Sequence, residues 1–220
     1  NKRNATVALN SIKKYKSKFK ISVLIKNKKK YFITSSNFEN NIKNILAAIT
    51  LISIFKDVHS LNKNIFNNYN VPEGRGDISN IKINKKNIFL IDESYNANLL
   101  SLSSAIKNFD SIYCKNNKKF LILGDMLELG KHSKKLHKKL INIINSSTIS
   151  KVSVYGKHIK ETFKKISKNK KGYIFTKTSQ IINLIKNDIN NNDYIMIKGS
   201  NSTGLHRIAS SLKKRKINVI

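Results

Sequence analysis

The sequence predicts an α/β protein, in which a mostly parallel sheet is covered by helices on both faces and is preceded by a β-rich and then helical segment. Beyond residue 87, short apolar runs alternate with segments of helical periodicity across short connections, as in parallel sheets. Residues 5–35 instead hold three β-rich runs. Hydrophobic residues make up 40% of the 220, which is enough to build a core.

The first third of the chain predicts a small, separate unit. Three runs, ATVALN, FKISVLI and KYFITSS, predict strands, and NKKK predicts a turn between the last two. Apolar residues at helical spacing over residues 40–56 predict a buried helix. A polar, Asn-rich stretch over 57–70 then leads to VPEGRGD, a candidate junction. We therefore expect two domains, at 1–70 and 71–220.

The second domain is predicted to hold five strands, each followed by a helix. The strands are expected at 87–93, 118–124, 151–156, 172–176 and 193–199. The helices are expected at 99–113, 134–146, 157–167, in TSQIINLIKNDI and at 203–214. KINVI, at the end of the chain, is expected to add a last strand. Ligands of such sheets bind outside the carboxyl ends of the strands. Polar loops follow three of these strands, at 92–98, 124–130 and 198–202, so we expect them to form one site.

The net charge of +31 comes almost entirely from lysine, because arginine occurs at only four positions. Lysine is accompanied by abundant asparagine and isoleucine, which is typical of an AT-rich genome. A nucleic-acid surface would use more arginine and aromatic side chains, so we expect no nucleic-acid partner, although a basic nucleic-acid-binding module stays an alternative. The single cysteine, Cys114, fits a reducing cytoplasm. We expect a cytoplasmic monomer without membrane insertion or signal peptide.

The loop IDESYNAN (91–98) carries the richest chemistry. Asp92 and Glu93 are suited to accept hydrogen bonds from ribose hydroxyls, and Tyr95 to stack on a base. Asn96 and Asn98 both donate and accept, which suits a zwitterionic peptide. The alternative is that these residues simply cap the following helix.

The two other loops and the junction add charged groups. Asp125 in LGDMLELG is suited to hold an amine, and Lys198, with the N–H groups that follow it, to bind a carboxylate or phosphate. Arg75 is suited to clamp phosphate or stack on adenine. The alternative for LGDMLELG is an ordinary strand-to-helix loop, and the alternative for the Lys198 loop is a capped helix start. The alternative for Arg75 is a salt bridge to Glu73 or Asp77. The five histidines show no metal-ligand spacing, and a P-loop is absent.

The order GRG, DESYNAN, LGDMLELG, a later histidine and KGS resembles the Mur ligase family, in the branch that adds D-alanyl-D-alanine. NNIKNILAAI (40–49) resembles the helix that ends the family's central domain, and the match spans about residues 37–210. The resemblance implies that 1–70 belong to a central ATP-binding domain and 71–220 form a Rossmann-like, dipeptide-binding domain. It further implies an ATP- and Mg²⁺-dependent amide ligase of peptidoglycan precursor synthesis. Such an enzyme joins D-alanyl-D-alanine to UDP-N-acetylmuramoyl-tripeptide through an acyl phosphate.

By position, the resemblance implies two groups of binding residues. For ATP these are Asn44, Arg75, Glu93 and Tyr95, and for the dipeptide Asn96, Asn98, Asp125, Lys198 and Ser200. The family's P-loop, metal ligands and modified lysine precede the matched part, so we expect no catalytic or metal-binding residue here, an N-terminally incomplete chain, and no activity from it alone.

Several positions depart from the family pattern. The family's GxHN stands here as Phe-Glu-Asn-Asn (38–41), the acid at 93 is Glu rather than Asp, and the proline after YNAN is Leu99. Another Mur-type ligase and a folylpolyglutamate synthetase stay as alternatives.

Overall fold

The computed structural model describes residues 6–35, 37, 39–69 and 72–214. The chain divides into two compact units, Asn1–Val71 and Pro72–Ile220. Within the described part, none of the helices has both the length and the apolar character needed to cross a bilayer.

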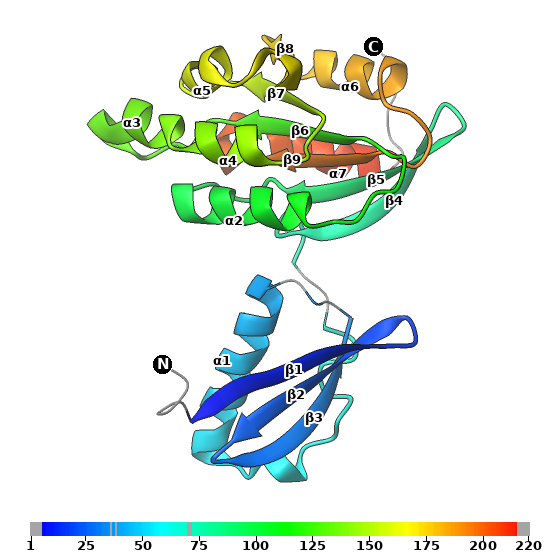
Figure 1. Ribbon diagram of the computed structural model, residues 1–220, viewed down its shortest axis with the longest axis vertical. Helices are drawn as coiled ribbons and strands as arrows, with labels where there is room; N and C mark the ends of the chain where they lie inside the picture. The colour runs from blue at the N-terminus through cyan, green and yellow to red at the C-terminus, as the bar shows by residue number, and fades with distance from the viewer. Residues whose placement is uncertain (1–5, 36, 38, 70–71, 215–220) are drawn as a thin grey trace. The chain divides into compact units, whose positions relative to one another are not determined.

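The first unit is a three-stranded antiparallel sheet packed on one helix (Figure 1). Strands β1 (Val7–Tyr15), β2 (Lys18–Ile25) and β3 (Lys28–Thr34) pair in sequence order, and α1 spans Glu39–Phe55. Their core includes Ile21, Phe32 and Ile45. The hairpin between β2 and β3 turns at Lys26 and Asn27, which both have positive φ as a two-residue type I′ turn requires. The turn therefore lies one residue earlier than NKKK predicted.

The second unit is a six-stranded sheet in the order β4-β5-β9-β6-β7-β8. Five neighbouring strands run parallel: β5 (Lys86–Glu93), β9 (Tyr194–Lys198), β6 (Lys119–Gly124), β7 (Lys151–Tyr155) and β8 (Lys171–Phe175). The edge strand β4 (Asp77–Ile83) pairs antiparallel with β5. The mostly parallel α/β fold is confirmed.

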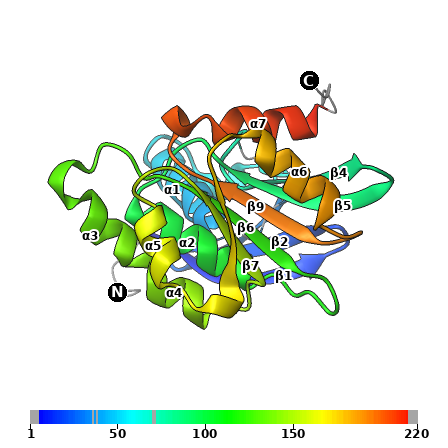
Figure 2. The ribbon, with the colours of Figure 1, turned by 90° about the horizontal axis from the view of Figure 1, so that it is seen from above.

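Helices cover both faces of this sheet, as predicted (Figures 1 and 2). On one face α2 (Leu99–Asp110), α4 (Leu140–Ser146) and α5 (Lys160–Lys165) contribute Leu102, Ile144 and Phe163 to the core. On the other face α6 (Ser179–Asn187) and α7 (Leu205–Lys213) contribute Ile181 and Ala209. Sheet residues are buried on both faces, which explains their continuous apolar runs.

Two features differ from the sequence prediction, and one prediction is not tested. Strand β4 was missed; it buries the alternating Ile81 and Ile83 and joins β5 through a turn at Asn84 and Lys85, both with positive φ. The helix predicted over 134–146 is divided into α3 (Ser133–Lys138) and α4, because Lys139 N–H bonds to the carbonyl three residues back, which tightens the helix there. The strand predicted at KINVI lies outside the described residues.

Candidate functional site

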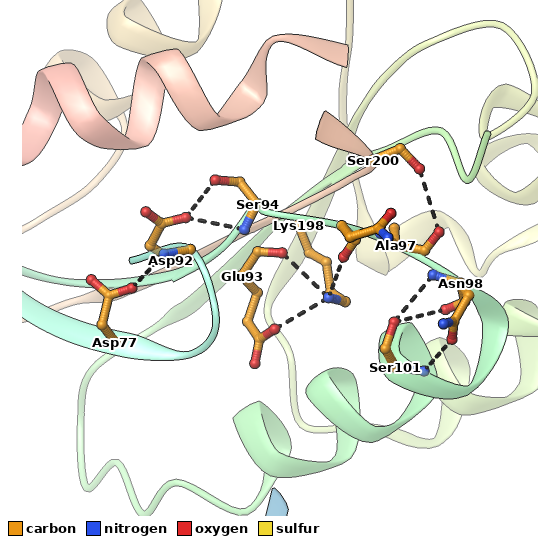
Figure 3. Close-up of polar contacts among 11 residues, drawn as sticks. Asp77, Asp92, Glu93, Ser94, Ala97, Asn98, Ser101, Lys198 and Ser200 are labelled. Atoms are coloured by element: carbon orange, nitrogen blue, oxygen red, sulfur yellow. Dashed lines mark hydrogen bonds and ion pairs between the residues drawn. The ribbon is translucent and has the colours of Figure 1, made fainter. Parts of the chain in front are cut away.

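The three polar loops lie side by side, because the strands that precede them are neighbours. Strand β9 lies between β5 and β6, and Lys198 at its end is in register with both Glu93 and Leu123. The predicted common edge is therefore confirmed as a geometric fact. Figure 3 shows how residues of two of these loops, DESYNAN and KGS, converge.

Lys198 joins the β5 loop to β9. Its side chain is almost fully buried, and Nζ lies 3.2 Å from Glu93 Oε2, 3.3 Å from the Glu93 carbonyl and 3.1 Å from the Asn96 carbonyl (Figure 3). Burial lowers the pKa of Lys198, and the Glu93 carboxylate opposes that shift. Its three donors are directed at the protein itself, so the side chain sets the path of the DESYNAN loop and orients Glu93.

Ser200 ties all three loops together. Its hydroxyl donates to the Ala97 carbonyl at 3.3 Å and accepts the Leu127 N–H at 2.9 Å, while its own N–H donates to the Asp125 carbonyl at 3.0 Å. The N–H of Ser200, which the sequence reading offered to an anion, is thus already used within the protein.

Asp125 is committed to the chain in a way that the sequence reading did not anticipate. Its buried carboxylate accepts the backbone N–H groups of Lys157, His158 and Ile159 at 2.7–3.0 Å. Gly156, at φ +139°, allows this approach, because a Cβ there would collide with the carboxyl group. The geometry favours a structural role for Asp125 over the predicted dipeptide contact.

Arg75 and Tyr95 form an exposed cation–π pair. The guanidinium carbon lies 4.3 Å from the centre of the Tyr95 ring. Tyr95 N–H donates to the Gly74 carbonyl at 3.0 Å, which brings the turn before β4 against the DESYNAN loop. The two residues predicted for the nucleotide therefore present one flat, cationic surface.

The alternative partners considered for Arg75 are taken by a lysine that sequence reasoning missed. Lys213 Nζ lies 2.6 Å from both Asp77 Oδ2 and Asp92 Oδ2, and 3.6 Å from Glu73 Oε1. Asp77 and Asp92 face each other in the β4–β5 register, and like charges in that position need a cation. The pairing of Asp77 with Asp92 could not be inferred from the sequence, because β4 itself was not predicted.

The two asparagines of the loop differ in role. Asn98 caps α2: its side chain accepts the Ser101 N–H at 2.8 Å, and Ser101 reciprocates in a capping box (Figure 3). The capping alternative is thus realised at Asn98. Asn96 is exposed, and its side-chain oxygen accepts only a local bond from Ala97 N–H among the described contacts. Asn44 lies exposed on α1, in the other unit.

His137 is a further structural residue that the residue-by-residue reading did not assign. It is fully buried; Nε2 accepts the Met126 N–H at 3.0 Å, and Nδ1 donates to the Ser133 carbonyl at 2.8 Å, a tautomer that we assign from these partners. Burial lowers the pKa of His137, against the opposing effect of the Ser133 bond. The neutral ring fixes the LGDMLELG loop. Among the described residues, no group of three His, Cys, Asp or Glu side chains is placed to hold a metal.

Comparison with known proteins identifies the family. Residues 80–201 match the family model described as "Mur ligase, glutamate ligase domain". The chain belongs to the Mur ligase family. The predicted family is confirmed, and the matched segment contains the loops at 92–98 and 124–130 and residues 198–201 of the third, while Lys213 and Arg75 lie outside it.

Two relatives of this Mur ligase chain carry the same name. It is 31% identical over 217 residues to the UDP-N-acetylmuramoyl-tripeptide–D-alanyl-D-alanine ligase of Buchnera aphidicola subsp. Baizongia pistaciae, covering 97% of this chain and 45% of that protein. The ligase of the same name from Rickettsia prowazekii is 28% identical over 78% of this chain and 36% of its own. The chain thus spans about half or less of the length of these relatives.

Solved Mur ligases share the fold. MurF of Thermotoga maritima, in complex with ADP, superimposes with a TM-score of 0.77 at 18% identity over 97% of this chain and 48% of its own. MurC of the same organism gives a TM-score of 0.67 at 17% identity, over 97% of this chain and 47% of its own. The fold is therefore common to ligases with different titles and does not by itself select a substrate.

Proposed function

We propose that this chain is part of an ATP-dependent ligase that joins D-alanyl-D-alanine to UDP-N-acetylmuramoyl-tripeptide in peptidoglycan precursor synthesis. On this proposal residues 1–70 belong to a central ATP-binding domain, and residues 71–220 form the domain that binds the dipeptide. The name shared by the relatives at 28–34% identity supports this choice over other Mur-type ligases. The reducing setting suggested by one free cysteine supports a cytoplasmic enzyme.

The observation that carries the proposal is the junction of DESYNAN with KGS at the ends of β5 and β9. The buried Lys198 and Ser200 donate hydrogen bonds to the carbonyls of Asn96 and Ala97 in the DESYNAN loop. The exposed Asn96 side chain therefore lies at the sheet edge where open α/β folds bind ligands. We assign Asn96 as the principal dipeptide contact, with the amide of Asn98 beside it. Lys198 and Ser200 then act by positioning this loop.

The nucleotide side is assigned to the Arg75–Tyr95 pair and Glu93. A guanidinium held over an aromatic ring offers a flat surface for a purine, and a carboxylate is the usual acceptor for ribose hydroxyls. Glu93 is already oriented by Lys198, so its carboxylate needs little rearrangement. Asn44, on α1 of the first unit, stays a proposed ATP-binding residue.

These residues bind and orient; they do not supply the bond-making chemistry. When bound, ATP supplies the phosphoryl group that activates the tripeptide carboxylate, and Mg²⁺ offsets the phosphate charge. We expect the dipeptide domain to hold the attacking amine at the activated carboxyl carbon. We therefore expect no ligase turnover from the 220 residues alone.

The proposal is tested by binding of amino-acid substrates to the whole 220-residue chain. In ¹H–¹⁵N NMR titrations we expect D-alanyl-D-alanine to shift the amides of residues 94–98 and 199–201 with saturation. L-Alanyl-L-alanine, L-glutamate and diaminopimelate serve as comparisons. Asn96→Ala should abolish saturation, while Asn116→Ala, in an exposed loop, should not change it.

The outcomes separate the candidate functions. Saturable binding of L-glutamate in place of the dipeptide would identify a folylpolyglutamate synthetase, and binding of diaminopimelate would identify another Mur-type ligase. Equal response to D- and L-dipeptides would also contradict the proposal, because the acceptor is defined by its D-configuration.

A further inference from the structure

A cavity of about 580 Å³ lies at the opposite edge of the same sheet from the candidate site. It is formed where β6, β7 and β8 begin, and Phe120 and Leu184 on its wall belong to the core beneath α6 and α7. We call it the β7–β8 hollow. It shares no residue with the three loops at the carboxyl ends of the strands.

The hollow is produced by an irregularity in the pairing of β7 with β8. The register passes from Val152↔Lys171 to Val154↔Ile174, so β8 contains one extra residue. Tyr173 N–H donates to the side-chain oxygen of Ser153 at 3.0 Å instead of to a backbone carbonyl. Bulges of this kind re-aim side chains, are frequent beside binding sites and are retained as functional features.

Small and polar residues keep this space open. Ser153 is a buried polar residue on the face of the sheet that packs against α6 and α7. Gly172 faces it across the bulge, and a Cβ at Gly172 would collide with the Ser153 hydroxyl and lie 3.1 Å from the Val152 carbonyl. Glycine is scarce here, with 8 in 220 residues, so its presence at this point is a specific requirement of the local packing.

The walls of the hollow are cationic. Lys118, Lys151 and Lys171 line it, against a single carboxylate, Asp188, which accepts the Tyr173 hydroxyl at 2.8 Å. Lys151 Nζ makes one bond, to the Lys171 carbonyl. Lys171 Nζ donates to the Lys164 carbonyl and lies 5.7 Å from the centre of the Phe163 ring, so this ammonium group is directed to α5 on the other face of the sheet. An ammonium group carries three donors, so Lys151 keeps donors for a ligand.

We propose that the β7–β8 hollow binds a small phosphate monoester with a flat apolar group. The ammonium groups of Lys118 and Lys151 outnumber the one lining carboxylate, Asp188, so the hollow attracts an anion such as a phosphate monoester. The Phe120 and Leu184 side chains supply an apolar wall for the rest of the ligand. A volume of about 580 Å³ falls within the range of small-molecule sites.

Lysine alone does not distinguish this place, because lysine and arginine total 43 in the chain. The bulge, the buried Ser153 and Gly172 do distinguish it, since none of them follows from a lysine-rich composition. An experiment must therefore separate binding in the hollow from general attraction of an anion to the basic protein surface.

The probe is phenyl phosphate, titrated into the full ¹⁵N-labelled chain at physiological salt, with inorganic phosphate and benzyl alcohol as separate arms. We expect saturable shifts at the amides of Ser153, Gly172 and Tyr173, with phenyl phosphate binding tighter than either half. Lys118→Gln with Lys151→Gln should weaken binding by roughly tenfold. Both lysines are exposed, so the fold should be retained.

The matched control is Lys131→Gln with Lys135→Gln, which removes the same charge from exposed positions away from the hollow. It should leave the affinity within about twofold, a small effect typical of screened surface charges. The proposal is overturned if the two double variants weaken binding equally, or if phenyl phosphate produces no saturable shift at the hollow. Shifts by inorganic phosphate spread over many surface lysines, without preference for Ser153 and Gly172, would likewise overturn it.

Discussion

Replacing Lys198 with methionine tests whether this buried ammonium holds the site together. Methionine keeps the volume of the stem but removes the donor to Glu93 Oε2 and to two backbone carbonyls. Hydrogen bonds to a charged donor contribute about 1.5 kcal/mol or more each. Part of that loss is offset because the cost of burying the charge disappears. Glu93 is 20% exposed at its side chain and can turn to water, which limits the loss further.

We therefore expect Lys198→Met to lower the free energy of unfolding by about 2 kcal/mol. With a slope of about 2 kcal/mol per molar urea, the unfolding midpoint of the second unit falls by about 1 M. Lys82→Met is the matched control, because Lys82 is exposed in β4 and its replacement should change stability by less than about 0.5 kcal/mol.

The dependence on pH gives a second readout. Burial lowers the pKa of Lys198 in the folded protein below its ordinary value of 10.5, so the unfolded chain binds this proton more tightly. Stability contributed by this group rises as pH increases through the window between the two pKa values. Lys198→Met should remove that rise. Wild-type stability in Lys198→Met, with unchanged amide exchange over residues 93–98, would refute a positioning role for Lys198.

Three other predictions address the supporting residues. Asp125→Ala should lower the free energy of unfolding, measured in urea, by about 2 kcal/mol, because three N–H groups lose their acceptor. Replacement of the exposed Asp57 by alanine should lower it by less. Equal effects of the two substitutions would contradict the structural role of Asp125. Burial lowers the pKa of His137 below 6.5, so the unfolded state binds the proton first and stability should fall as pH drops below 6.5. His137→Gln should flatten that fall and His132→Gln should not, as measured by thermal unfolding between pH 5 and 8. Tyr95→Ala should leave the Arg75 guanidinium without its ring partner and raise the ionic-strength dependence of ADP binding to the complete ligase, and an unchanged dependence would remove the cation–π pair from the nucleotide site.

The sequence predicted the sheet edge because its signals were local. Apolar runs mark β5, β6 and β9, and polar residues follow each of them at once. Once parallel strands are inferred, their carboxyl ends must share an edge, so the meeting of three loops follows from periodicity alone.

The partners of individual side chains were not predictable in the same way. Asp125 is bound by N–H groups more than thirty residues later, and Lys213 contacts two carboxylates of a hairpin that lies more than 120 residues earlier. The sequence around a carboxylate in a glycine-bounded loop does not distinguish a residue that binds a ligand from one that accepts hydrogen bonds from a backbone segment distant in sequence. The sequence pattern therefore identified polar residues of the right region but assigned Asp125 to a ligand.

The order of strands adds a constraint on how the site forms. Strand β9 is the last in sequence of the strands that the structure describes in this sheet, but it lies between β5 and β6, which come at least 70 residues earlier. Until β9 is inserted, Lys198 and Ser200 are absent from the edge, and the DESYNAN and LGDMLELG loops lack the contacts that join them. Pairings of this sequence separation form late, because loop closure must precede the contacts that stabilise it. The ligand-binding edge should therefore be among the last parts of the second unit to become protected from amide exchange during refolding, after the hairpin of β4 with β5.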